Sequence, residues 1–304
     1  MWMFLALLNS AVFAGIAVID KRLIDRHISS LPNYYVWIGF AMLIYGVVFM
    51  AIGGFPDTEN LWHTVVAGLS GLAWGLALVM MFFGFKIQEV SRASAMIFTF
   101  PVFVALFAVV FMGETLVPLQ WLAIVVVVMG GVLISVTGPG GGRTKFTKII
   151  PVLLGAALLI ATGHLTAKYA LEEISVSLVT SWHFLGVAAV LLCFWRRDTV
   201  PNLRRVMSKK EPLILMLVAE GVLVPIALLA QILATNLGPV SLVATITGTH
   251  PIFVVLYTAV LSMPGLRIMN ESLNRNTLVV KAASVTLIIG GVASLGLLAD
   301  RTIG

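Results

Sequence analysis

Long apolar runs, separated by short polar segments, recur along the whole chain. A transmembrane helix needs about 20 mainly apolar residues. By this criterion the pattern predicts ten membrane-spanning helices, over residues 2–20, 33–54, 62–85, 92–112, 119–138, 149–168, 175–195, 212–235, 240–262 and 278–299. Strands of a membrane barrel would alternate apolar and polar residues, whereas residues 122–128 are apolar throughout. The pattern therefore predicts an all-α membrane protein.

The second half of the chain repeats the first at an offset of about 150 residues. Residues 90–104 match residues 240–254, including the proline inside each apolar run, Pro101 and Pro251. Because each copy contains five spans, an odd number, the second copy must enter the membrane from the opposite face. The sequence thus predicts two inverted-topology five-helix repeats, an architecture in which many secondary transporters place the substrate site between the copies.

The repeat also predicts the domain boundaries. The first five-helix repeat covers residues 1–138, a hinge covers 139–148, and the second repeat covers 149–304. Residues 138–142 read Gly-Pro-Gly-Gly-Gly, and glycine and proline end helices and loosen a connection. Because this hinge is short, we expect the two copies to pack as one membrane domain.

Composition and charge place these helices in a membrane and orient them. Of the 304 residues, 60% are hydrophobic and only 11% are charged, which argues against a soluble domain. The net charge of +6 would suggest nucleic-acid binding in a soluble protein, but here all lysines and arginines except Lys168 and Arg301 lie at or beside the odd-numbered connections. Basic residues that flank spans are retained in the cytoplasm. We therefore expect a cell-membrane protein with cytoplasmic odd-numbered connections and both termini outside, which contacts membrane lipid and binds no nucleic acid.

Short motifs recur near the end of each copy. The first copy contains Gly-Glu-Thr-Leu at 113–116 and Gly-Gly-Val at 130–132, and the second contains Asn-Glu-Ser-Leu at 270–273 and Gly-Gly-Val at 290–292. Lysines end the first and sixth spans, and prolines interrupt the fourth and ninth. In these features nearly the whole chain resembles the EamA-type transporters of the drug/metabolite transporter superfamily. The resemblance implies alternating-access export of a small-molecule substrate such as an amino acid or a drug-like solute.

Glu220 is predicted to couple transport to protons. It lies about eight residues into the eighth span, where a charged side chain costs roughly 2.5–3.5 kcal/mol to insert. An isolated carboxylate at such depth is a functional candidate that can exchange a proton. The alternative is a neutral glutamate hydrogen-bonded to a neighbouring helix. Pro225, one turn later, predicts a kink in the same span.

Three histidines at membrane depth are predicted substrate contacts. His164 follows Gly163, where helices can approach closely, and its ring can also relay protons. His183 occupies the position where the resemblance implies a cation, so it can meet an anionic substrate group. His250 precedes Pro251, whose missing N–H leaves carbonyl groups free at mid-depth, as beside a cavity. For each histidine the alternative is structural: a satisfied interhelical hydrogen bond or, for His183, an interfacial position.

Gln231, Asn9 and Trp74 complete the predicted substrate site. The two amides can equally serve to hold neighbouring helices together. Trp74 lies away from the interfaces where tryptophan usually collects, so it either lines a cavity that selects flat or apolar solutes or packs in the core. Lys21 and Lys168, at the ends of their spans, are expected to snorkel toward the interfaces.

The sequence lacks several kinds of catalytic and metal motif. It contains no GxxxxGK[ST] motif for ATP, no HExxH and no serine nucleophile elbow, so we predict no enzyme, no cofactor and no metal. The single cysteine, Cys193, excludes an internal disulfide and is expected to be a small buried hydrophobic residue. The leading hypothesis is a secondary transporter, monomeric or homodimeric, driven by a proton gradient or by its substrate's own gradient. The alternatives are a membrane-embedded accessory or sensor subunit and an enzyme acting on lipid-linked substrates.

Overall fold

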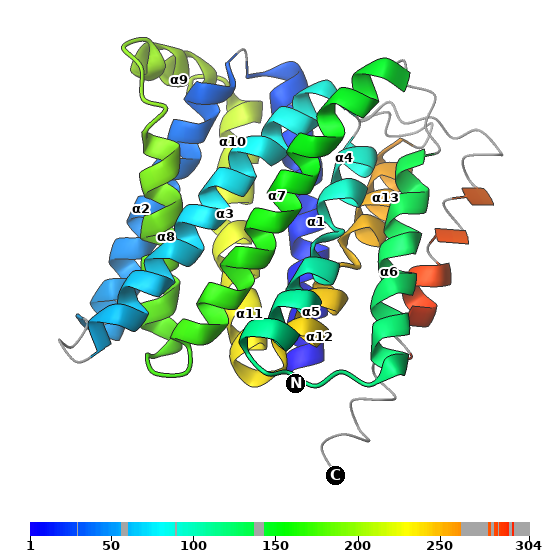
Figure 1. The fold of residues 1–304 in the computed structure, drawn as a ribbon. Coiled ribbons are helices and arrows are strands. Elements are labelled where there is room, and N and C mark those ends of the chain that lie inside the picture. The colour runs from blue at the N-terminus through cyan, green and yellow to red at the C-terminus, as the bar shows by residue number, and fades with distance from the viewer. Residues whose placement is uncertain are drawn as a thin grey trace.

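Figure 1 shows the fold in a computed structural model, which describes residues 1–28, 30–55, 60–88, 90–136, 143–262 and, near the end of the chain, 279–280, 283–284, 286–291 and 294. Within these residues the chain is helical with short connections and contains no strand. The all-α prediction is thus confirmed for this part of the chain. Half of the tenth predicted span lies outside the described residues, as do the glycine-rich hinge at 138–142, the motif at 270–273 and Arg301.

The described helices with assigned bounds, except Thr199–Met207, fall on the first nine predicted spans. In chain order they are α1 (Trp2–Arg26), α2 (Leu31–Gly53), α3 (Leu61–Ile87), α4 (Val90–Ile97), α5 (Phe100–Phe111), α6 (Pro118–Val136), α7 (Arg143–Ala170), α8 (Val176–Leu192), α9 (Thr199–Met207), α10 (Lys210–Val218), α11 (Val224–Leu237), α12 (Val240–Thr247) and α13 (His250–Leu261). Within the described part of the chain, six segments are long and apolar enough to cross a membrane: Trp2–Arg26, Leu31–Gly53, Leu61–Ile87, Ile149–Ala170, Lys210–Leu237 and Val240–Leu261. Shorter apolar helices cover Phe100–Phe111, Pro118–Gly130 and Val176–Leu192.

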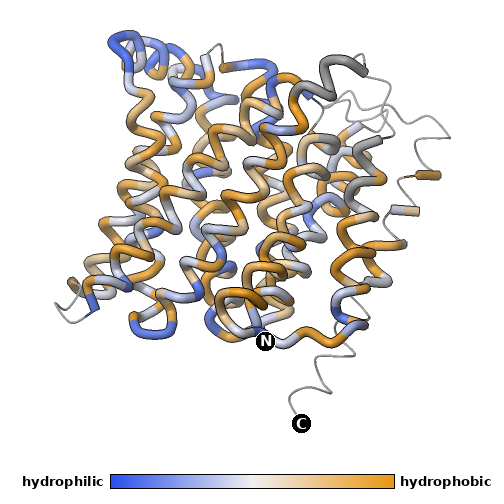
Figure 2. Tube along the Cα trace, viewed as in Figure 1, coloured by the Kyte–Doolittle hydropathy of each residue, from blue (hydrophilic) through white to orange (hydrophobic). Residues whose placement is uncertain are grey.

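The helices lie side by side in one bundle (Figure 1). Helix α2 packs along α8, α3 packs against α7 and α8, and α1 packs against α11. Figure 2 shows apolar residues along the helices and polar residues gathered toward the two ends. Large apolar side chains such as Phe4, Ile52, Trp62 and Phe111 are exposed. The exterior therefore presents far more apolar surface than a soluble monomer exposes, as a protein embedded in lipid does.

The fourth and ninth predicted spans are each broken into two helices at the same point. Helix α4 ends at Ile97 and α5 begins at Phe100, while α12 ends at Thr247 and α13 begins at His250. In each case a proline occupies the first turn of the second helix, where its missing N–H costs no helical hydrogen bond. The predicted break beside His250 is therefore confirmed. Helix α5 packs against α12 and α4 against α13, so the two broken spans cross each other near their breaks.

The eighth predicted span contains a π-helical turn over Ala219–Leu223, between α10 and α11. Pro225 stands in the first turn of α11, so the regular hydrogen-bond ladder cannot continue through it. Single π turns interrupt helices and recur at functional sites. This turn contains Glu220, and the carbonyl of Gly221 accepts a hydrogen bond from Tyr45 Oη at 2.8 Å.

Two expectations for the segment after α8 are wrong. The basic segment 196–210, expected to be a loop, contains helix α9, with Arg204 and Arg205 in its last turn. A helix this short and polar carries no span-length apolar signal, so hydropathy alone misses it. Cys193, at the carboxyl end of α8, is exposed rather than buried.

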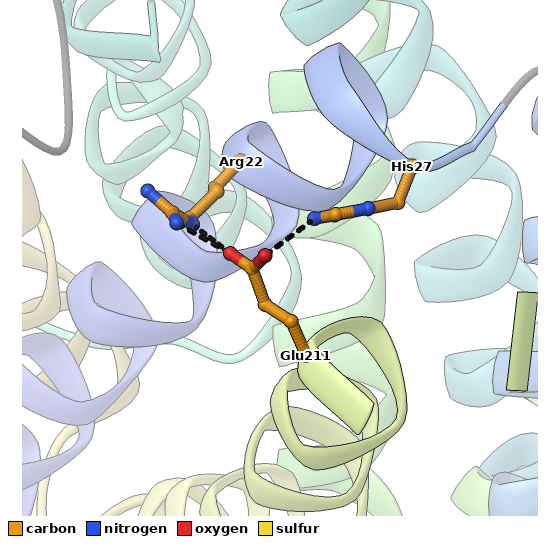
Figure 3. A network of polar contacts seen from close by, with 3 residues as sticks. All are labelled: Arg22, His27 and Glu211. Carbon is orange, nitrogen blue, oxygen red and sulfur yellow. Dashed lines mark hydrogen bonds and ion pairs between the residues drawn. The ribbon is translucent and has the colours of Figure 1, made fainter. Parts of the chain in front are cut away.

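At the α9 end of the bundle, an ionic network joins the first helix to α10 (Figure 3). Arg22 Nε donates to Glu211 Oε1 at 3.1 Å, and His27 Nε2 lies 3.6 Å from Glu211 Oε2. These groups are partly solvated, so salt screens their attraction. The network links the two halves of the chain at this end.

Lys21 and Lys168 bind the carboxyl ends of two other helices. Lys21 Nζ donates to the Phe85 carbonyl at 2.6 Å, in the last turn of α3, and Lys168 Nζ donates to the Thr235 carbonyl at 2.9 Å, in the last turn of α11. The last carbonyls of a helix lack intrahelical partners and carry partial negative charge. The snorkelling prediction is therefore incomplete, because the two ammonium groups cap helices instead of only reaching water.

Glu114 binds the amino end of α12. Its carboxylate accepts a hydrogen bond from Val240 N at 2.7 Å and another from the Ser241 hydroxyl. An acidic group at a helix N-terminus satisfies free N–H groups and complements the helix dipole. This contact joins the segment after α5 to the second half of the chain. The corresponding Glu271 lies outside the described residues.

Helices α3 and α8 touch through their backbones. A Cβ atom on Gly71 would lie 2.0 Å from the carbonyl oxygen of His183, and one on Gly186 would lie 2.4 Å from the carbonyl oxygen of Gly68. Small residues permit such close approach between helices in a membrane. At the offset of the sequence repeat, Gly71 corresponds to Gly221, where a Cβ would meet no described atom within 4 Å. The packing is thus tight at Gly71 and open at Gly221.

Candidate functional site

A central cavity lies among the helices. Its lining comes from both halves of the chain, including α1, α2 and α3 from the first and α8, α11 and the π turn from the second. Four predicted site residues line it: Asn9, Trp74, Glu220 and His250. Asp20 lines it as well, so we call it the acidic cavity.

A second cavity adjoins the first and shares part of its lining. Its lining includes the other three predicted site residues, His164, His183 and Gln231, and we call it the histidine cavity. Trp74 and Leu228 line both cavities and therefore lie between them. The structure thus places all seven predicted site residues on two neighbouring cavities rather than around one centre.

The two cavities lie at different depths in the bundle. Helix α1 runs toward the α9 end, whereas α7 and the α10–α11 segment run away from it (Figure 1). Asp20, late in α1, and Glu220, early in the α10–α11 segment, therefore lie in the half nearer α9. His164, late in α7, and Gln231, late in α11, lie in the opposite half.

Asp20 is a candidate site residue that the sequence analysis missed. It is only 1% exposed and its Oδ1 accepts a hydrogen bond from Tyr34 Oη at 2.6 Å. The apolar run suggests that the first span ends at residue 20, beside Lys21. From sequence alone, Asp20 is therefore expected to be a charged residue at the membrane interface. Helix α1 instead continues to Arg26.

A helical pattern could have identified Asp20. Asn9, Phe13, Ala17 and Asp20 all line the acidic cavity, and their spacing of three or four residues places them on one face of α1. Beyond Asp20, Tyr34 also lines a small pocket at the α9 end, together with Asn33 and Asn202 on neighbouring elements. Tyr34 therefore stands between this pocket and the carboxyl group of Asp20.

Glu220 is buried beside Asp20 at the π turn. It is 2% exposed, and its Oε2 makes no hydrogen bond within the described part of the chain. The two carboxyl groups are close enough for their charges to interact. An unpaired buried polar atom is costly, so this oxygen is available to a proton, a water molecule or a ligand.

Aromatic rings form much of the wall of the acidic cavity. Phe98 stacks on the His250 ring, with ring centroids 3.8 Å apart and an interplanar angle of 5°. Phe13 lies against Trp74 at a centroid distance of 5.9 Å, and Phe82 also lines the cavity. No lysine or arginine lines the acidic cavity among the described residues. The cavity therefore combines acidic groups with an apolar, aromatic wall.

A hydrogen bond to Ser70 determines which His183 nitrogen is free to accept. The Ser70 hydroxyl donates to the Ala67 carbonyl at 2.6 Å and lies 2.9 Å from His183 Nδ1. Because a hydroxyl has one proton, Ser70 must accept from Nδ1–H. In the neutral ring, Nε2 is then an acceptor, and it is buried without a partner in the described structure.

Gln231 joins His164 to two threonines. Its side-chain amide lies 3.2 Å from His164 Nδ1, 3.1 Å from Thr235 Oγ1 and 3.3 Å from Thr247 Oγ1. His164 Nε2 is buried and has no partner among the described atoms. The histidine cavity thus offers a free ring nitrogen from His164 and another from His183.

No arrangement of three or more His, Cys, Asp or Glu side chains that could hold a metal ion occurs within the described residues. The free polar atoms of both cavities instead suit reversible hydrogen bonding and charge pairing.

Comparison with known proteins gives the family. The model of the EamA-like transporter family matches residues 1–136 and 147–296. An uncharacterized transporter from the cobO 3′ region of Sinorhizobium sp. is 29% identical over 145 residues, which cover 44% of this chain and 96% of that relative. The chain also superposes on a protein of known crystal structure with a TM-score of 0.69 at 20% identity, covering 100% of this chain and 98% of the other, which shows a shared fold. The chain therefore belongs to the EamA-like transporter family and is a multi-pass membrane protein.

Proposed function

We propose that the protein is a secondary active transporter that moves a small solute across the cell membrane by alternating access. The observation that carries this proposal is the pair of adjoining cavities, with unpartnered buried polar atoms, on either side of Trp74. Such groups are costly to insert into a membrane, and a helix bundle with a purely structural role gains nothing from them. For the same reason we favour transport over an accessory or sensor subunit and over an enzyme acting on lipid-linked substrates.

We further propose ten transmembrane helices in two inverted repeats. The matching breaks at Pro101 and Pro251, and the equivalent contacts of Lys21 with α3 and Lys168 with α11, support this arrangement. The Sinorhizobium relative matches this chain over nearly its own full length, yet spans less than half of the chain. A half-length relative is what a duplicated unit predicts.

The proposed orientation places the α9 end in the cytoplasm and both termini outside. Arg204 and Arg205 of α9 and Arg22 of α1 lie at this end, and basic residues favour the cytoplasmic side. The direction we propose is export, as the resemblance to EamA-type exporters implies. The solute is a small metabolite such as an amino acid or a drug-like molecule.

Glu220 is the proposed proton-coupling residue. Its buried, unpartnered carboxyl oxygen faces the same cavity as Asp20, and a carboxyl that binds a proton and solute in turn can link their movements. The pocket beside Tyr34 at the α9 end, together with the Tyr34–Asp20 hydrogen bond, supports a polar route toward this group from the proposed cytoplasmic side.

Solute counterflow in proteoliposomes tests the proposal. Vesicles containing the purified protein are loaded with unlabelled amino acids, polyamines, nucleosides or drugs, and entry of the labelled solute is followed with and without a proton gradient. We expect counterflow of at least one solute, and faster flux when the gradient is imposed. Absence of flux for every solute would favour the accessory role, and a chemically altered solute would favour the enzyme.

Replacing Trp74 by alanine should make the transporter leak. The ring stands between the two cavities, so its loss joins them. We expect downhill flux of the counterflow solute, without a proton gradient, to rise about tenfold, as lowering a barrier by about 1.4 kcal/mol would produce. Trp62→Ala is the control, because Trp62 lies on the same helix but is exposed. Equal downhill flux in wild type and Trp74→Ala would show that the ring does not separate the cavities.

A further inference from the structure

We infer that the acidic cavity binds an organic cation whose positive centre contacts Asp20 and Glu220 and whose apolar body packs on the aromatic wall. The inference rests on the proposed function, since it names the class of solute that the transporter would carry. It goes beyond the site predicted from sequence because Asp20 was absent from that site.

The free polar atoms of the acidic cavity are mainly hydrogen-bond acceptors. Glu220 Oε2 is buried and has no partner in the described chain. Asn9 donates through Nδ2 to the Ala227 carbonyl at 2.8 Å, which leaves its Oδ1 as a second buried acceptor without a partner there. Asp20 supplies further acceptor capacity beyond its bond from Tyr34. A ligand that satisfies these atoms must bring positive charge or donors.

The protein supplies no fixed positive charge to balance the two carboxyl groups. The ionisable groups that face Glu220 from neighbouring elements are Asp20 on α1, Tyr34 and Tyr45 on α2, and His250 on α13. None of them is a lysine or arginine. Buried carboxylates are stable only when a cation or proton compensates their charge, so a cationic ligand can supply what the described lining lacks.

Nearby basic side chains already have partners outside the cavity. Lys21 donates to the Phe85 carbonyl and to Asp25, while Arg22 pairs with Glu211 at the bundle end. Neither residue lines the acidic cavity. Neither basic residue therefore neutralises the acidic side chains of the cavity, which remain available to a ligand.

The wall of the cavity suits an apolar body attached to the cation. Phe13, Trp74, Phe82 and Phe98 line it together with aliphatic side chains. Aromatic faces attract cations and pack against apolar groups.

His250 also lines the acidic cavity, and both of its ring nitrogens are buried without a partner in the described chain. The other deep histidines with such a nitrogen, His164 and His183, line the histidine cavity on the other side of Trp74 and Leu228. The neutral His250 ring carries no charge, so a free amino acid in the acidic cavity would place its carboxylate beside two acidic groups, with no lysine or arginine in the described lining to pair with it.

Three solutes with the same phenylethyl body test the inference. Phenethylammonium is cationic, phenylalanine is zwitterionic and hydrocinnamate is anionic. Isothermal titration calorimetry with the purified full-length protein measures the binding of each. We expect phenethylammonium to bind at least about tenfold more tightly than either of the others, the factor that one charge-assisted contact contributes. Equal or tighter binding of phenylalanine or hydrocinnamate would overturn the inference.

Two substitutions locate the bound cation. Asp20→Asn and Glu220→Gln should each weaken phenethylammonium binding by about tenfold or more. The matched controls are Asp198→Asn and Glu173→Gln, which make the same chemical changes at exposed positions and should leave binding unchanged. Unchanged affinity in both cavity variants would place the cation elsewhere and reject this site. The comparison of the three solutes on the wild-type protein remains decisive if a variant fails to fold.

Binding and transport separate the two proposals. If phenethylammonium binds through Asp20 and Glu220 but no solute crosses the vesicle membrane, the site stands and the transport function fails. If another solute shows counterflow while phenethylammonium does not bind, transport stands and the cation site is rejected.

Discussion

Replacing Glu220 by glutamine should abolish proton-driven solute movement while the protein still folds. Glutamine keeps the shape of the side chain but cannot exchange a proton. It also removes the possibility of a second negative charge beside Asp20, so we expect no loss of stability. Flux driven by a proton gradient should fall to that of protein-free vesicles, whereas counterflow, which needs no net proton movement, should persist for a solute that does not depend on this carboxylate.

The control for this variant is Glu173→Gln, because Glu173 is exposed in the connection between α7 and α8. It should retain proton-driven flux. Flux measured against imposed gradients of both signs would reveal any residual coupling. If Glu220→Gln still responds fully to the proton gradient, Glu220 is not the coupling residue, and Asp20, the other buried carboxyl in the cavity, becomes the candidate.

Replacing Gly71 by alanine should destabilise the protein strongly. The new Cβ would lie 2.0 Å from the carbonyl oxygen of His183, and the clash is with backbone, which cannot rotate away. Overpacking of this kind typically costs about 1–3 kcal/mol, and a backbone contact belongs at or above the upper end. Separation of α3 from α8 would also break the Ser70–His183 hydrogen bond. Thermal unfolding in detergent, followed by size-exclusion chromatography, measures the loss.

Gly221→Ala is the matched control for Gly71→Ala. Gly221 holds the corresponding place in the second half of the chain, but a Cβ there meets no described atom within 4 Å. Surface substitutions of this type usually change stability by no more than about 0.5 kcal/mol. Equal unfolding temperatures for the two variants would contradict the tight contact between α3 and α8.

The sequence was sufficient for the helices and for much of the candidate site. Long apolar runs have few alternatives to helices in lipid, because every backbone polar group must be satisfied within the segment. The breaks in two spans followed from Pro101 and Pro251, since proline removes a backbone donor. Five of the seven candidate residues, among them Glu220 and His164, were chosen for the cost of burying a polar group, and all seven line the two cavities.

Hydropathy could not tell which helices meet or which face of each helix points inward. In a soluble protein the polar face of a helix marks its outside. Helices α2 and α8 show almost no such asymmetry, because lipid and protein interior are equally apolar. Rotation about the helix axis is then decided by side-chain fit between helices. That is why the burial of Asp20 was missed.

The pattern of hydrophobic residues along the chain was therefore sufficient to predict the number of apolar runs, their helical form and most of the deeply buried polar residues. Tertiary packing alone paired Asp20 with Glu220, placed Trp74 between two cavities, and brought Gly71 against His183 while leaving Gly221 free. The physical reason is distance along the chain. A side chain's burial cost is local to its own helix, but its partners lie on helices far away in sequence, and only their close packing brings those partners together.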